Sequence, residues 1–242
     1  MKYLAFALIP LIVVATPAAA EHDRGPGLPG QRDGNAIVYP ARDFDTVTLG
    51  GAARVVVRTG ATFSVRADGP AAAFANFRVA RTGRTLEVGH RYDGRNTPLE
   101  GRITVYVTLP VLAGATVGGS GSIDADRAAA TEFSGTVGGS GNLRVARLDA
   151  RKAALSVGGS GTIVAAGQVG ALTADVGGSG GISAPNLRAS RADVAVGGSG
   201  NVRAMVIGSA SVSIAGSGDV DLGPQAHCAV SKAGSGSVRC GR

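Results

Sequence analysis

Serines flanked by glycines are the side chains of this sequence whose spacing comes nearest to a catalytic motif. The stretch Gly177-Gly178-Ser179-Gly180-Gly181 fits the G-x-S-x-G pattern, in which a nucleophilic serine occupies a sharp turn. That chemistry needs a strand-to-helix turn, and no helical pattern follows Gly181. The match is therefore attributed to a repeat, and we predict no catalytic residue.

The glycine-rich phrases also approach the calcium-binding nonapeptide, but the ligand is missing. The pattern G-G-x-G-x-D places an acidic residue in its sixth position. This chain has aliphatic residues there, at Ile123, Leu143, Ile163, Ile182 and Val202. Aliphatic side chains cannot coordinate calcium, and no G-x-x-x-x-G-K-[ST] phosphate loop occurs. We predict neither a metal site nor a cofactor.

Carboxylates raise the possibility of a polysaccharide-active enzyme. Such enzymes use clustered acids to cleave glycosidic bonds, and sugar sites favour exposed aromatic residues. The repeat region has a single aromatic residue, Phe133. Its aspartates fall at different phases of the repeat: Asp124, Asp126, Asp149, Asp175, Asp193, Asp219 and Asp221. A tight cluster is not predicted, so a lyase or hydrolase is kept as the alternative function.

The two cysteines, Cys228 and Cys240, lie near the C-terminus, and Gly234 is midway between them. A bend at Gly234 would bring the thiols together. In an exported protein a disulfide is favoured over free thiols, and for a loop of this size it contributes about 3 kcal/mol. A metal site is disfavoured, because His227 is the only histidine nearby and zinc prefers four ligands.

Export is predicted from the N-terminus. Lys2 precedes a short apolar run from Tyr3 to Ala15, and Ala18-Ala19-Ala20 offers small residues for cleavage. The alternative is a membrane anchor, for which the run is too short. We expect residues 1–20 to be a signal peptide, the mature chain to begin near Glu21, and no transmembrane segment to follow.

The charge is mildly cationic. The net charge of +7 becomes +6 when Lys2 leaves with the signal peptide. Such an excess favours anionic surfaces such as lipopolysaccharide, lipid headgroups or nucleic acid. No block of five or more like charges occurs, so we expect the arginines on a solvated face and predict no nucleic-acid partner.

Composition indicates which elements must position these residues. Glycine accounts for 39 of 242 residues, aromatic residues for 4% and charged residues for 17%. A coiled coil would contain far less glycine, and collagen would have glycine at every third position. Disorder is disfavoured because 44% of the residues are hydrophobic. An all-β chain with tight bends remains.

Two zones precede the repeats: a leader, and the first part of a single domain that spans residues 37–242. Residues 21–36 are rich in glycine and proline and are expected to form a flexible leader. Residues 37–116 alternate apolar and polar, which predicts a strand-rich part with a helical turn within 71–77. The expected strands cover 46–49, 54–57, 62–65, 85–88 and 102–107. Seven of the eight mature aromatic residues fall here and should form the bulkiest core: Tyr39, Phe44, Phe63, Phe74, Phe77, Tyr92 and Tyr106.

One phrase recurs seven times over residues 117–242. It reads Val-Gly-Gly-Ser-Gly-Ser-Ile in its first copy, and the copies begin at Val117, Val137, Val157, Val176, Val196, Ile214 and Lys232. Their spacings are 20, 20, 19, 20, 18 and 18 residues. A repeat of this length is typical of a solenoid, whose units bury their apolar faces only by stacking.

Alternation within the phrase predicts β-coils. Leu155, Val157 and Ile163 share one face of an extended chain, and Ser156 and Ser160 share the other. Glycines would permit positive φ and close approach of neighbouring backbones at a corner. Stacked coils would then place the repeat serines in one column: Ser120, Ser140, Ser160, Ser179, Ser199, Ser217 and Ser235.

The free energies of burial and of chain ordering favour stacked repeats over an isolated repeat. The inward side chains of one repeat contribute roughly 6–12 kcal/mol of burial. Ordering a repeat costs on the order of 20–40 kcal/mol of backbone entropy. A lone repeat is therefore unfolded, and parallel stacking adds ladder hydrogen bonds worth about 1 kcal/mol each. We predict a right-handed parallel β-helix with coils of about 20 residues and an N-terminal β-rich cap.

These repeats, behind a signal peptide and a strand region, resemble the bacterial putative auto-transporter adhesin head GIN domain family. The resemblance covers about residues 40–240. It implies a β-solenoid in the periplasm or cell envelope with an adhesive role, and no catalytic residues come with it. An Asp after Gly-Ser-Gly is typical of such repeats, and only Gly216-Ser217-Gly218-Asp219 has it here.

The function predicted from these observations is an exported, non-catalytic envelope module, adhesin-like or structural. Its location would be the periplasm or the cell surface, with envelope polysaccharide or lipopolysaccharide as candidate partners. Besides the polysaccharide-active enzyme, the alternative is a periplasmic accessory protein that binds anionic envelope ligands through arginine.

Overall fold

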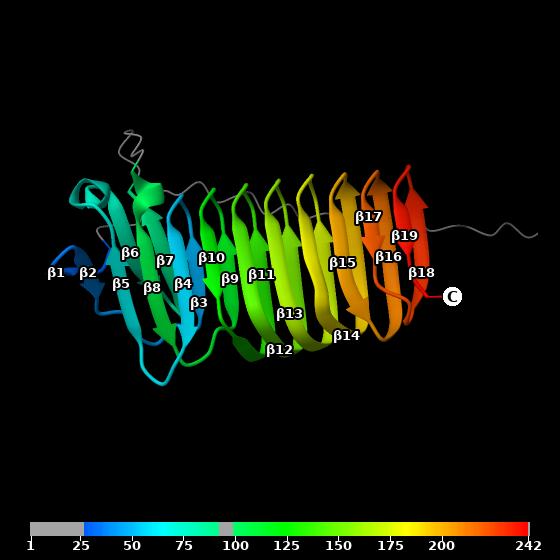
Figure 1. The fold of residues 1–242 in the computed structure, drawn as a ribbon, viewed down its shortest axis with the longest axis horizontal. Helices are drawn as coiled ribbons and strands as arrows, with labels where there is room; N and C mark the ends of the chain where they lie inside the picture. The colour runs from blue at the N-terminus through cyan, green and yellow to red at the C-terminus, as the bar shows by residue number, and fades with distance from the viewer. Residues whose placement is uncertain (1–26, 92–98, 242) are drawn as a thin grey trace, which may run out of the picture.

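The computed structural model describes residues 27–91 and 99–241, which form an elongated stack of β-coils (Figure 1). Strands β1 and β2 lie at one end of the stack, and β18 and β19 lie at the other. The predicted signal peptide and the first part of the predicted leader fall outside the described residues.

The described residues contain the following elements in chain order: β1 (Gln31–Asp33), β2 (Ala36–Tyr39), β3 (Thr46–Leu49), β4 (Arg54–Thr59), β5 (Ser64–Asp68), the 3₁₀ helix η1 (Ala71–Phe74), β6 (Phe77–Thr82), β7 (Thr85–His90), the 3₁₀ helix η2 (Glu100–Arg102), β8 (Thr104–Leu109), β9 (Gly114–Val117), β10 (Ser122–Ala125), β11 (Ala128–Val137), β12 (Asn142–Val157), β13 (Thr162–Val176), β14 (Gly181–Gly198), β15 (Asn201–Val206), β16 (Gly208–Gly216), β17 (Asp219–Asp221), β18 (Ala226–Ala233) and β19 (Ser237–Arg239).

The strands make two long walls that face one another. The first wall runs β6-β7-β3-β9 and continues through the C-terminal parts of β11, β12, β13 and β14 to β16 and β18. The second wall runs β1-β2-β5-β8-β4-β10 and continues through the N-terminal parts of β12, β13 and β14 to β15, β17 and β19. From β3 and β4 onward, neighbouring strands along each wall are parallel, which confirms the predicted β-solenoid.

Inward side chains form continuous aliphatic columns. Strand register places Val137, Val157 and Val176 over one another in the first wall. It does the same for Leu143, Ile163 and Ile182 in the second wall. All six are buried. The alternation predicted from the sequence is confirmed, because each coil directs these residues into the space between the walls.

A further coil, which lacks the repeated phrase, lies before the first Gly-Ser-Gly. Leu49 is in register with Val117, and Arg54 is in register with Ser122. The segment between them, residues 50–53, therefore occupies the corner that the Gly-Gly-Ser-Gly phrase fills in later coils. From the sequence, Gly50-Gly51 indicates only a turn, because Ala52 and Ala53 replace the serine and the last glycine of the phrase.

The N-terminal end of the solenoid is closed by antiparallel strands and aromatic side chains. β5 is antiparallel to both β2 and β8, and β6 is antiparallel to β7. The rings of Phe44 and Phe63 lie 5.1 Å apart, and those of Phe74 and Phe77 lie 5.7 Å apart. The predicted cap and the helical turn (η1) are thus present. Tyr92 lies outside the described residues.

The predicted leader extends too far. Residues 31–33 form strand β1, which is antiparallel to β2. Two residues, Gly34 and Asn35, connect the strands, and Gly34 has a φ of 61°. Glycine at the first loop position suits a tight hairpin turn, which ordinary side chains disfavour. A glycine in a polar stretch can therefore mark a hairpin as well as a flexible segment.

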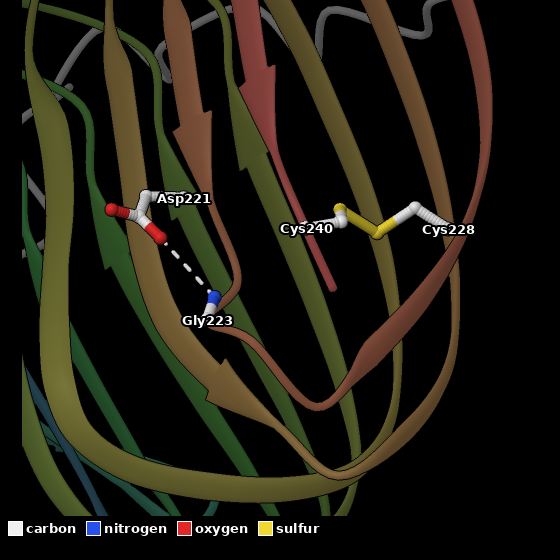
Figure 2. Close-up of a disulfide and its surroundings, with 4 residues drawn as sticks. All are labelled: Asp221, Gly223, Cys228 and Cys240. Atoms are coloured by element: carbon white, nitrogen blue, oxygen red, sulfur yellow. Dashed lines mark hydrogen bonds between the residues drawn. A yellow bond between two sulfur atoms is a disulfide. The ribbon is translucent and has the colours of Figure 1, made fainter. Parts of the chain in front are cut away.

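The C-terminal coil has a different interior from the coils before it. Cys228 is in register with the buried Ala210, and its disulfide to Cys240 joins the two walls (Figure 2). The Cα atoms are 6.3 Å apart, and both cysteines contact the core. Lys232 is in register with the buried Ile214 and donates a hydrogen bond to the Gly236 carbonyl at 2.9 Å. The predicted disulfide is confirmed, and it closes the last coil.

Candidate functional site

The Gly-Gly-Ser-Gly phrase forms the corner that leads from the first wall to the second. In the copy that begins at Val157, strand β12 ends at Val157 and β13 begins at Thr162. The Gly158 N–H donates to the Val137 carbonyl at 2.8 Å, and the Gly161 N–H donates to the Gly139 carbonyl at 3.0 Å. The corners are therefore joined to one another by backbone hydrogen bonds, like the strands.

The second glycine of each phrase is required by close approach between coils. A Cβ on Gly159 would meet the carbonyl oxygen of Gly139, and one on Gly139 would meet that of Gly119. The same contact recurs at Gly119, Gly178, Gly198, Gly216 and Gly234. Positive φ was also expected here, but among these glycines it occurs only at Gly198, Gly216 and Gly234. Lack of space for a side chain is thus the requirement common to all the corners.

The last glycine of the phrase is restricted in the same way. A Cβ on Gly161 would meet the Gly141 carbonyl oxygen and the Val137 side chain. A Cβ on Gly141 would meet the Gly121 carbonyl oxygen and the Val117 side chain. In both cases the aliphatic column fills the space beneath the glycine. The serine between the two glycines is the one position of the corner that faces solvent with a functional group.

The repeat serines are exposed at all seven positions predicted to form a column: Ser120, Ser140, Ser160, Ser179, Ser199, Ser217 and Ser235. The strands on both sides of each corner are in register, so the serines follow one another along the solenoid at intervals of about 4.8 Å. No hydrogen bond from these hydroxyl groups is found within residues 27–91 and 99–241. The hydroxyl groups therefore present a row of free donors and acceptors to solvent.

A second polar row lies beside the serine column on the outer face of the second wall. Gly181 interrupts this row between Thr162 and Asn201. The members of the row are the residues that directly follow the other corners: Ser122, Asn142, Thr162, Asn201, Asp219 and Ser237. Near the C-terminus these residues join successive coils, because the Asp219 N–H donates to Asn201 Oδ1 at 3.0 Å and the Ser237 N–H donates to Asp219 Oδ1 at 3.1 Å. Hydrogen bonds from the Ser237 hydroxyl and N–H lower the pKa of Asp219.

The aspartates of the repeat region are distributed over both walls. Asp124 pairs with Arg54 at 2.9 Å, Asp149 with Arg147 at 2.7 Å, and Asp221 with Arg239 at 3.4 Å. Asp175 and Asp193 lie on the outer face of the first wall, and burial raises the pKa of Asp175. Over the described ranges, no group of three or more His, Cys, Asp or Glu side chains could hold a metal ion. Asp124 and Asp221 thus form ion pairs between coils, whereas Asp149 and Arg147 belong to the same strand.

The two enzyme-like motifs have structural explanations. Gly181 begins strand β14, so the G-x-S-x-G match leads into a strand and lacks the helix of a nucleophile elbow. Ile123, Leu143 and Ile163, in the sixth position of the nonapeptide pattern, are fully buried. Both motifs therefore reflect the corner and the aliphatic column that follows it.

One exposed aromatic residue was not recognised from the sequence. Tyr106 was expected in the core, but 46% of its surface is exposed on the outer face of the second wall. It lies between Arg66 and Val56 in register. A cavity of about 400 Å³ beside it is also lined by Arg54, Arg58 and Asp124. The alternation of β8 in the sequence could have predicted this exposure, because Val105 and Val107 point inward and Tyr106 must then point outward.

Gly51, in the corner nearest the N-terminus, is covered by a glutamate. Glu100 is buried, and its Oε1 occupies the space that a Cβ on Gly51 would need. Its Oε2 lies 3.5 Å from His90 Nδ1. Glu100 thus occupies, at the N-terminal end of the glycine column, the position that a further corner would fill.

The fold and the corner together define a class of protein: a β-solenoid built on Gly-Ser-Gly corners. The chain belongs to the family described as putative auto-transporter adhesin, head GIN domain, which matches residues 43–240. The resemblance seen in the sequence is therefore confirmed. No curated protein matches the chain.

Three crystal structures show the same fold. A putative adhesin from Bacteroides fragilis is 20% identical, with a TM-score of 0.77 over 85% of this chain and 95% of that chain. A putative lipid binding protein from Parabacteroides distasonis is 20% identical, with a TM-score of 0.65 over 87% and 98%. A putative adhesin from Parabacteroides merdae is 18% identical, with a TM-score of 0.64 over 89% and 97%. At these identities the likeness concerns the fold alone.

Among the residues that the structure describes, no helix has the length and apolar character needed to cross a bilayer.

Proposed function

We propose that this protein is an exported, non-catalytic module of the cell envelope that acts by binding a surface. In this proposal residues 1–20 direct export and are removed. Membership of an adhesin-like family and the fold shared with two putative adhesins support the proposal.

The single observation that carries the proposal is the exposed serine column. Hydroxyl groups repeat along the rod at each corner, and the polar row that includes Asn142 and Thr162 runs beside them. Each hydroxyl both donates and accepts a hydrogen bond, which suits a ligand rich in hydroxyl groups. A polymer lying along the rod would meet the same groups in every coil, so many weak contacts would add together. Polysaccharide of the envelope is the ligand class we propose.

Retention of the purified mature chain by isolated envelope fractions tests this function. The native chain should cosediment with the polysaccharide-containing fraction. Replacing Ser140, Ser160 and Ser179 by Glu should abolish retention, because charge disrupts the column without touching the core. The matched control replaces three exposed residues of the first wall, Ser134, Ala154 and Ser213, by Glu and should retain binding. Equal retention of the two variants would contradict the proposal.

The same preparations test the alternative of an enzyme. Incubation with a panel of polysaccharides should release no reducing ends and no unsaturated sugars, because the aspartates are dispersed over both walls and several are held in ion pairs. Turnover of any polysaccharide by the native chain would overturn the non-catalytic assignment.

A further inference from the structure

The outer face of the solenoid has a groove at the corner opposite the serine column. Its volume is about 720 Å³, and its lining extends from β11 across the three neighbouring strands β12, β13 and β14. Lys152, Ala171 and Arg191 are in register across the three strands. The middle coil therefore supplies a small side chain where both neighbouring coils supply a long cationic one.

The floor of the groove is open for a steric reason. A Cβ on Gly170 would come within 2.7 Å of the Arg151 carbonyl oxygen, so a side chain does not fit there. Val169, before it, is buried, and Ala171, after it, adds only a methyl group. The flanking coils stand two strand spacings apart, about 10 Å. A ligand group can thus reach the backbone of β13 with cations on both sides.

The groove carries an excess of positive charge. Arg151, Lys152 and Arg191 line it, with Glu132 and Asp149 as the acids. Both acids already have cationic partners: Glu132 accepts from Lys152 at 2.9 Å, and Asp149 pairs with Arg147 and Arg127 at 2.7 and 3.6 Å. Neither Arg151 nor Arg191 forms an ion pair with any residue in the described part of the chain. These guanidinium groups are available to a ligand.

The electrostatic environment of Glu132 agrees with this charge balance. The hydrogen bond from Lys152 lowers the pKa of Glu132, the charge of Lys152 lowers it further, and Arg151 adds a smaller effect. Lys152 is therefore the main partner of Glu132, Arg151 has only a weaker interaction with it, and Arg191 is not among the residues that affect its pKa.

We propose that this groove binds a phosphate group, with Arg151 and Arg191 approaching it from opposite sides over the Gly170–Ala171 floor. A guanidinium group binds phosphate oxygens through two parallel N–H donors. Phosphate has enough oxygens to serve both arginines together, whereas a planar carboxylate serves one in this way. The inference rests on the proposed function to the extent that an envelope supplies phosphate-bearing molecules.

Titration of the ¹⁵N-labelled native chain with inorganic phosphate tests the site. The amide signals of Gly170 and Ala171 should shift and saturate. Arg151→Ala with Arg191→Ala should weaken binding at least about tenfold, since each loses a charge-assisted hydrogen bond. Ala171→Glu should abolish binding, because it fills the floor with negative charge. Binding should also fall as the salt concentration rises.

Matched controls separate the groove from general charge. Arg203→Ala removes an exposed arginine from the second wall, and Ser213→Glu adds an acid to the first wall away from the groove. Both should leave phosphate binding unchanged and, like the groove variants, should keep the native thermal midpoint. Absence of saturation in the native chain, or an equal loss in Arg203→Ala, would overturn the inference.

Two further probes identify the source of the phosphate. Binding to vesicles that contain phosphatidic acid, but not to pure phosphatidylcholine vesicles, would indicate a lipid headgroup. Binding to a hexose phosphate, but not to the vesicles, would indicate a phosphorylated sugar. Envelope retention without phosphate binding overturns this inference alone. Phosphate binding without envelope retention overturns the proposed function alone.

Discussion

At the scale of single residues, the glycines of one corner have unequal roles although they are neighbours in the sequence. A Cβ on Gly159 would meet the backbone of Gly139, whereas a Cβ on Gly158 would have nothing within 4 Å. Gly159→Ala should therefore lower the free energy of unfolding by about 1–3 kcal/mol, the usual cost of overfilling a close contact. Urea denaturation of each purified variant measures this difference.

Gly158→Ala is the matched control for that substitution. Gly158 is exposed and is not among the glycines with positive φ, so alanine should leave stability unchanged or raise it by about 0.4–1 kcal/mol through the unfolded chain. If both variants lost the same stability, flexibility of the corner rather than space between coils would be the reason for the glycines.

Two aspartates should give opposite pH dependence. Burial raises the pKa of Asp175, so its folded-state contribution is favourable below about pH 4, the pKa of unfolded aspartate, and is lost as pH rises through the folded value. Hydrogen bonds from Ser237 lower the pKa of Asp219, so its contribution is present above about pH 4 and is lost as pH falls through the folded value.

Thermal midpoints measured from about pH 3 to about pH 7 test both signs. At neutral pH, Asp175→Asn should be more stable than the native chain and Asp219→Asn less stable. Both differences should shrink toward acid pH. A loss of stability in Asp175→Asn at neutral pH would show that the carboxylate has a favourable partner.

At the scale of elements, the last coil shows how the solenoid ends. Val230 has the inward register of the buried Val212, yet 49% of its surface is exposed because, among the described residues, β18 pairs with β16 and with no strand beyond it. Lys232 is placed where Ile214 lies in the preceding coil. An inward-facing charge at an exposed edge disfavours stacking with another molecule. The terminal coil is thus closed by the disulfide and protected by the lysine.

Lys232→Val should remove this protection. The variant restores the aliphatic column at an end whose strand edges are open, so association between copies should appear and grow with concentration. Sedimentation velocity over a range of concentrations measures it. Lys232→Gln keeps the position polar and should sediment like the native chain. A variant with valine that sediments as a monomer at every concentration would show that the disulfide alone closes the end.

The sequence was sufficient for the coils and their contents, because the repeat specifies both period and face. It was insufficient where a coil departs from the phrase. Residues 50–53 form a corner without serine, and residues 31–33 pair in a hairpin although they lie in a polar stretch. In both cases the neighbouring strand, which is distant in the sequence, determines the structure.

The candidate sites were predictable to different degrees. The serine column follows from spacing alone, since each of the seven copies of the phrase contributes a serine at the same corner. The phosphate groove does not, because Arg151 and Arg191 are distant in the sequence and the groove depends on the small residues of the coil between them. In the sequence, these two arginines are not distinguished from the other arginines, which are scattered along the chain. The strand register, which aligns Lys152, Ala171 and Arg191, brings Arg151 and Arg191 to the two sides of the same coil.

At the scale of the whole molecule, stability should depend on contacts between successive coils, as in other solenoids. Removing residues 197–214 tests this, because it excises one coil of the 18-residue spacing and joins Val196 to Ala215. In the first wall, Val196 then replaces Ile214 as the neighbour of Lys232. In the second wall, Ile182 replaces Val202 as the neighbour of Val220. Every inward column is kept in phase, so the shorter rod should fold.

The shortened chain should retain a β-rich far-UV spectrum and unfold in urea with a smaller dependence on denaturant, since less surface is exposed on unfolding. Removing residues 197–205 alone is the matched control. It deletes half a coil, so aliphatic residues of the second wall would meet polar positions of the first, and cooperative unfolding should be lost. If the half-coil deletion folded as well as the full one, register between coils would not be what holds the rod together, and the serine column and the arginine-lined groove would lose their physical basis.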